Sequence, residues 1–113
     1  MKKELQKGTI KELQRYITLK IKERGFEDET LHERLLLLAE EVGELINASR
    51  KVSGMNVDHN REIKNEMGEE IADVLNMIFA VGIKAGVNIE EEFFEKEKKI
   101  DKRNYKRTKN KIN

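Results

Sequence analysis

The stretch Leu35-Leu36-Leu37-Leu38-Ala39-Glu40-Glu41-Val42-Gly43-Glu44 decides how this chain folds. Its four consecutive leucines cover most of the circumference of a helix, because successive residues are rotated by about 100°. Glu41 and Glu44 follow at a spacing of three residues, which places both carboxylates on one face of the same helix. The stretch therefore predicts a central helix, packed on several sides, that carries two carboxylates at the border of its apolar face.

A second stretch, Glu69-Glu70-Ile71-Ala72-Asp73, repeats this pattern further along the chain. Glu70 and Asp73 are again three residues apart and lie beside an apolar face that includes Ile71 and Val74. Carboxylates brought together from two facing helices repel one another unless they are protonated, paired with cations or bound to a metal ion. Mg²⁺ or Mn²⁺ suits ligands that are all oxygen better than Zn²⁺ does. The two stretches therefore predict a site for a hard divalent cation between two helices.

The position of these acidic residues around the helix distinguishes them from charged residues on a solvent-exposed face. Glu41 and Glu44 share a stripe with Leu37 and Ala48, whereas Glu40 points about 100° away from that stripe. Gly43 and Gly68 lie inside the two predicted helices, where glycine costs about 0.8–1.0 kcal/mol relative to alanine. We expect these glycines to permit a close helix approach or access for a ligand.

The rest of the chain also has a helical period, and it contains no proline. We expect an all-α fold in a single domain that spans residues 1–113, with a basic C-terminal tail that frays from about Thr108. The predicted helices run from about Lys3 to Arg24 with Gly25 after it, from a capping box at Thr30 and Glu33 to about Val52, from about Arg61 to Ala85 with Gly86 after it, and onward from a cap at Asn88.

Composition limits the protein's partners and its core. Only 37% of the residues are hydrophobic and 5% aromatic, so the core is thin and burial between subunits is expected. The chain has no cysteine, which excludes disulfides and thiolate-bound metal and suits a reducing cytoplasm. No apolar run approaches the roughly 20 residues that span a membrane, so no membrane partner is expected.

The two acidic motifs resemble those of the MazG-like all-α nucleoside triphosphate pyrophosphohydrolases, whose signature is E-E-x-x-E followed by E-x-x-D. Glu40-Glu41-x-x-Glu44 and Glu70-x-x-Asp73 match it, and the resemblance extends from about Leu35 to Arg107. It implies a four-helix MazG-like bundle completed by oligomerisation, as a homodimer or homotetramer. It also implies Mg²⁺-dependent hydrolysis of an NTP or dNTP to the monophosphate and pyrophosphate, with a housekeeping role in nucleotide pools.

The same resemblance assigns expected roles to individual residues. Glu41, Glu44, Glu70 and Asp73 would hold Mg²⁺, with Mn²⁺ as a possible substitute. Glu40 would assist a second metal ion or orient the attacking water. Lys99 and Arg103, one helical turn apart on the last predicted helix, match the family's phosphate-binding positions more loosely, and a solvated basic face is the alternative.

Three other functions remain open at this point. A di-iron bundle needs Glu-x-x-His on two helices, but the chain offers only Glu29-Thr30-Leu31-His32. A nucleic-acid-binding protein using the basic segment Lys96 to Lys111 would have a single aromatic residue there, Tyr105, so no stable nucleic-acid complex is expected. A non-catalytic helical interaction protein would use the acidic motifs only as charged faces.

Overall fold

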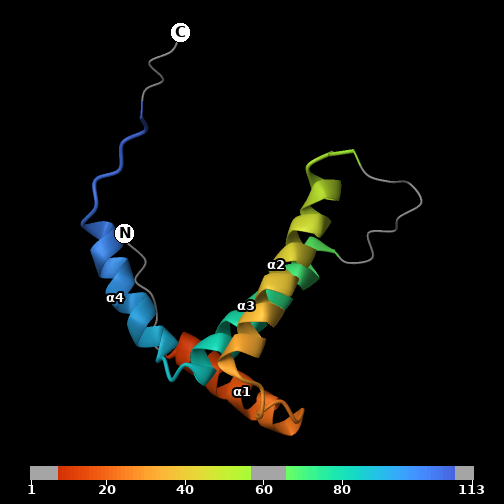
Figure 1. Cartoon of the computed structure of the whole chain (residues 1–113). Coiled ribbons are helices and arrows are strands. Elements are labelled where there is room, and N and C mark those ends of the chain that lie inside the picture. Colours follow the sequence, from red (N-terminus) through yellow and green to blue (C-terminus); the bar gives the residue numbers. More distant parts are fainter. Residues whose placement is uncertain (1–7, 57–65, 109–113) are drawn as a thin grey trace.

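The computed structural model describes residues 8–56 and 66–108, which form four α-helices and no strand within those ranges (Figure 1). The predicted all-α fold is therefore confirmed. In the described part of the chain, no helix is long and apolar enough to cross a membrane. The helices are α1 (Thr9–Glu23), α2 (Leu31–Val52), α3 (Met67–Lys84) and α4 (Ile89–Asp101).

An antiparallel pair formed by α2 and α3 is the main packing unit (Figure 1). The α1 helix packs against α3 near the end of the pair where α2 begins and α3 ends, and α4 packs on α1 and leads away from the pair. Within residues 8–56 and 66–108, the buried hydrophobic residues are Ile17, Ala48, Phe79 and Ala80. The core is thus as thin as the composition predicts, and it is concentrated along α3.

Most of the predicted helix caps are confirmed. The Thr30 hydroxyl accepts a hydrogen bond from the Glu33 backbone N–H at 3.1 Å, and the Glu33 carboxylate accepts one from the Thr30 N–H at 3.0 Å. The Asn88 side chain caps α4 by accepting from the Glu91 N–H at 3.2 Å. Gly25 and Gly86 follow their helices with φ of 79° and 72°, the left-handed region that glycine adopts without steric cost.

Three predicted boundaries were too generous. The first helix begins at Thr9, because Gly8 has φ of 103° and interrupts the helical backbone; the predicted start at Lys3 lies outside the described residues. The third begins at Met67, since Glu66 is extended, and Arg61 also lies outside the described residues. The fourth ends at Asp101, well before Thr108, because the basic residues that follow offer no apolar face to pack.

Within one chain, α2 is not the surrounded helix that its leucines predicted. Leu37 and Leu38 are half-buried, whereas Leu35 and Leu36 are 45% and 58% exposed. The physical reason is that α3 is the one helix packed along the length of α2, so a single flank of α2 is covered.

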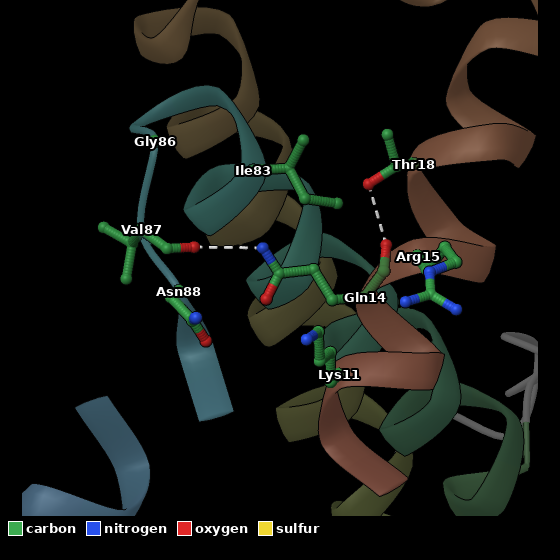
Figure 2. Close-up of a pocket in the computed structure, with 8 residues that line it drawn as sticks. All are labelled: Lys11, Gln14, Arg15, Thr18, Ile83, Gly86, Val87 and Asn88. Carbon is green, nitrogen blue, oxygen red and sulfur yellow. Dashed lines mark hydrogen bonds between the residues drawn. The ribbon is translucent and has the colours of Figure 1, made fainter. Parts of the chain in front are cut away.

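At the corner between α3 and α4, the Ile89 side chain packs closely on Gly82, a glycine that the sequence did not single out. A Cβ at Gly82 would lie 2.7 Å from Cδ1 of Ile89, whereas a Cβ at Gly43 or Gly68 would meet no atom of the described residues within 4 Å. The predicted close approach at those two glycines is therefore wrong within the chain. Gln14 of α1 holds the same corner, donating from Nε2 to the Val87 carbonyl at 3.0 Å beside a cavity of about 400 Å³ (Figure 2).

Candidate active site

Three of the predicted metal ligands meet between α2 and α3. Glu41 on α2 and Glu70 and Asp73 on α3 each offer a carboxylate oxygen, and these oxygens all lie within 4.8 Å of one another. The antiparallel pairing explains why, because residues three apart on α3 face the same turn of α2. We call Glu41, Glu70 and Asp73 the carboxylate triad.

Glu70 is the most deeply buried member of the triad, with only 1% of its surface exposed. Its Oε2 atom is buried and accepts no hydrogen bond from the described part of the chain. Burying a carboxylate oxygen without a partner is costly, and a native structure normally has a reason for it. A cation at the triad would supply the missing partner.

The surroundings of Glu41 favour its neutral form. Burial raises the pKa of the Glu41 carboxyl above its usual range, and the negative charges of Asp73 and Glu70 raise it further, with smaller contributions from Glu40 and Glu44. A divalent cation would reverse this effect, because it stabilises the ionised form of every carboxylate around it.

The chemistry of the triad fits a Mg²⁺ or Mn²⁺ ion. Oxygen ligands at about 2.1 Å from Mg²⁺ lie about 3.0 Å apart when neighbouring and about 4.2 Å apart when opposite, distances within the 4.8 Å limit that holds the oxygens of the triad. Three carboxylates leave further coordination positions free for water and phosphate oxygens, which is usual for Mg²⁺ sites that act on nucleotides.

The other predicted acidic residues lie around the triad and not within it. Glu44 is exposed and is not among the carboxylates that converge within 4.8 Å. Glu40 is exposed too, as its helical phase predicted. Both are near enough to raise the pKa of Glu41, so their charges act on the same site.

The two predicted phosphate-binding residues are remote from the α2–α3 pair. Lys99 is exposed on α4, which packs on α1, and Arg103 lies beyond the end of that helix. Arg103 donates from Nη1 to the Tyr105 hydroxyl at 3.4 Å. The expected placement of both residues on one helix is therefore wrong, because α4 ends two residues before Arg103.

Arg34 is a buried charge that the sequence reading missed. It is 2% exposed and lies near the start of α2, against the carbonyls of Ala80 and Phe26. Two features of the sequence could have indicated its burial. Arg34 directly precedes the leucine run, and it lies seven positions before Glu41, which places both residues on the same face of α2.

Comparison with known proteins identifies the family of this chain. A profile of the phosphoribosyl-ATP pyrophosphohydrolase family matches residues 10–104, which include all four helices except the first residue of α1. The chain belongs to the phosphoribosyl-ATP pyrophosphohydrolase family. This family lies within the MazG-like all-α superfamily, so the resemblance is confirmed at that level. Members of the phosphoribosyl-ATP pyrophosphohydrolase family are hydrolases that act on phosphoric anhydrides. No curated protein matches the chain.

Proposed function

We propose that this protein hydrolyses NTPs or dNTPs to the monophosphate and pyrophosphate in a reaction that depends on Mg²⁺. The observation that carries the proposal is the carboxylate triad, in which the buried Glu70 presents an oxygen without a hydrogen-bond partner. Converging carboxylates of this kind support a bound cation, and membership of the family indicates a pyrophosphohydrolase reaction.

The triad residues would hold the metal ion, which when bound supplies Lewis acidity and neutralises phosphate charge. Ion binding would lower the pKa of Glu41, which is raised in the metal-free protein, because the ion stabilises the ionised carboxylate; metal affinity would therefore depend on pH. Glu44, one turn after Glu41 and exposed, is free to change rotamer and complete the ligand set. Glu40, beside the triad and open to solvent, would orient the attacking water or assist a second ion.

We propose further that the protein works as a homodimer or homotetramer. Large apolar side chains are exposed on α2 and α3, beyond what isolated surface residues explain. These are Leu35, Leu36, Ile46, Ile71, Leu75 and Ile78. A second copy packed on these faces would cover them and surround α2, as its sequence predicts.

Lys99 and Arg103 remain proposed phosphate contacts, supported by their positive charge and exposure. Because α4 leads away from the α2–α3 pair of its own chain, the phosphate that they contact would be held at the triad of another copy (Figure 1). A cytoplasmic location, where nucleotide pools are found, belongs to the same proposal.

Phosphoribosyl-ATP is a second candidate substrate, favoured by the family whose profile matches. It carries the same triphosphate as ATP, so the triad would serve either reaction. The additional ribose phosphate is the feature that would separate the two substrates.

The decisive experiment is a substrate panel with Mg²⁺, containing the common NTPs and dNTPs and phosphoribosyl-ATP, analysed for monophosphate and pyrophosphate. We expect pyrophosphate release by the unmodified protein and loss of it in Glu41→Gln. Glu69→Gln is the matched control, because Glu69 is an exposed neighbour outside the triad. Absence of pyrophosphate from every substrate would falsify the proposed function.

A further inference from the structure

We propose that Arg34 is a positioning residue that sets the register of α2 against α3 and thereby brings Glu41 opposite Asp73. The register itself is a property of the fold, whereas its consequence for metal binding rests on the proposed function. Arg34 lies outside the triad and acts through the two helices that carry it.

The hydrogen bonds of Arg34 connect the start of α2 to α3 and to the loop before α2, and so oppose sliding of α2 along its axis. Its Nη1 donates to the Ala80 carbonyl of α3 at 2.8 Å, and its Nη2 donates to the Phe26 carbonyl in the loop before α2 at 3.1 Å. Its Nε lies 3.5 Å from a Glu29 carboxylate oxygen without forming a hydrogen bond. The planar guanidinium thus ties the start of α2 to one carbonyl near the end of α3.

The hydrogen bond between Arg34 and Ala80 and the facing pair Glu41 and Asp73 correspond to the same alignment of α2 with α3. Glu41 follows Arg34 by seven residues on α2, and Asp73 precedes Ala80 by seven residues on α3. In two antiparallel helices these intervals have the same length, about 10.5 Å at 1.5 Å per residue. If the arginine keeps its carbonyl partner, Glu41 and Asp73 must therefore face each other.

Apolar packing alone would define this register weakly. Hydrophobic contact has no preferred direction, so apolar side chains by themselves oppose sliding only through their shapes. Two of the buried apolar residues of the pair, Ala48 and Ala80, have side chains too small to interlock strongly, which leaves Phe79 as the large buried apolar side chain among the described residues of α2 and α3. Arg34, by contrast, would lose its carbonyl partner, because one helical turn is about 5.4 Å.

A shifted register would dismantle the metal site. Moving α3 by one turn would separate Glu41 and Asp73 by about 5.4 Å more along the helix axis. A single Mg²⁺ ion spans only about 4.2 Å between opposite ligand oxygens, so it could not bridge the displaced carboxylates. Metal affinity should therefore depend on Arg34, although Arg34 is two turns away from Glu41.

The absence of native cysteine makes the register directly measurable. The double variant Leu37→Cys with Met77→Cys brings its two cysteines together in the observed register. Leu37 follows Arg34 by three residues, and Met77 precedes Ala80 by three, so the two positions keep the same alignment. Leu37→Cys with Val81→Cys reports a register shifted by one turn. We expect the first pair to form a disulfide much faster in the unmodified background. After Arg34→Met we expect both pairs to form at comparable rates.

Mn²⁺ binding, followed by electron paramagnetic resonance, measures the consequence. Arg34→Met and Arg34→Lys should weaken binding by about tenfold or more, the usual effect of losing a residue that orients metal ligands. Ile17→Ala is the matched control, since it removes a buried side chain of α1 outside the α2–α3 pair and should leave Mn²⁺ affinity within about twofold once folded.

The outcomes separate this inference from the proposed function. If unmodified protein binds no Mn²⁺, the proposed metal site is wrong, but the disulfide rates still test the register. If Arg34→Met does not fold, Arg34→Lys keeps the charge while losing the two-carbonyl fork and is measured in its place. Unchanged disulfide preference in a folded Arg34 variant overturns the positioning role.

Discussion

Glu41 of α2 and Asp73 of α3 face each other across the helix pair, and after burial the charge of Asp73 contributes most to raising the pKa of Glu41. Two carboxylates from different helices are thus held together although they repel. The metal-free protein carries an electrostatic cost at its candidate site, and a divalent cation would remove it.

This cost predicts how stability varies with pH. A carboxyl group whose pKa is higher in the folded state binds its proton more tightly there, so its contribution to stability is fully present below its unfolded pKa. That contribution is lost as pH rises through the raised folded pKa. We expect the free energy of unfolding of metal-free protein to fall over this interval in urea titrations. Glu41→Gln should remove this part of the pH dependence, and a profile that is unaltered by the variant would contradict the assignment.

Replacing the buried carboxylate should affect metal-free and metal-loaded protein in opposite ways. Glu70→Gln replaces a buried carboxyl group with a neutral amide beside Glu41 and Asp73, so repulsion between carboxylates falls and we expect the metal-free free energy of unfolding to rise by about 1 kcal/mol or more. The stabilisation by Mg²⁺, about 2.7 kcal/mol at a hundredfold excess over the dissociation constant, should disappear. Thermal unfolding with and without Mg²⁺ measures both effects. Equal Mg²⁺ stabilisation in Glu70→Gln and in the control Glu69→Gln would rule out Glu70 as a ligand.

Gly82 should be intolerant of even a methyl group. A Cβ there would lie 2.7 Å and 2.9 Å from Cδ1 and Cγ1 of Ile89, so Gly82→Ala forces the Ile89 side chain to shift at the α3–α4 corner. Overpacking typically costs about 1–3 kcal/mol, which outweighs the gain of about 1 kcal/mol in helix propensity. Chemical denaturation should show net destabilisation, partly relieved by adding Ile89→Val, which removes Cδ1. Gly43→Ala, in open space, should show no such loss.

The capping box at the start of α2 should weaken in acid. The pKa of Glu33 lies below its usual value. The hydrogen bond with the Thr30 backbone lowers it most, and the hydrogen bond with the Thr30 side chain lowers it further. Its contribution to stability is therefore present above the unfolded pKa and is lost as pH falls through the lowered folded pKa. Thr30→Ala should cost about 1 kcal/mol at neutral pH and less at acidic pH, measured by urea unfolding. Thr30→Ser, which keeps the hydroxyl acceptor, should behave like the unmodified protein; a loss in Thr30→Ala that does not change with pH would contradict this.

Local sequence signals predicted the elements well but not all of their ends. The capping box at Thr30 and the glycine stops at Gly25 and Gly86 are decided by neighbouring residues, so a sequence reading can find them. The last helix was predicted too long because charged residues at helical spacing are compatible with a helix without stabilising one. Packing of an apolar face gives most helices their stability, and beyond Asp101 that face is missing.

The candidate site was predictable only in part, for a related reason. Spacing places Glu41 and Glu44 together on one helix, and Glu70 and Asp73 together on another, but it says nothing about how the two helices are aligned. The alignment selects Glu41, Glu70 and Asp73 as the converging group and leaves Glu44 exposed beside them. It also buries Arg34, whose role depends on a carbonyl 46 residues away in the sequence.

The sequence by itself determined the all-α class, the helix caps and the two acidic motifs, because each depends on residues within a few positions of one another. The tertiary structure alone decided which carboxylates converge, that Oε2 of Glu70 is buried without a hydrogen-bond partner among the described residues, and that the leucines of α2 are left partly uncovered. These properties arise from long-range packing, where the desolvation of a charge depends on the neighbouring helix and not on the residues adjacent in sequence.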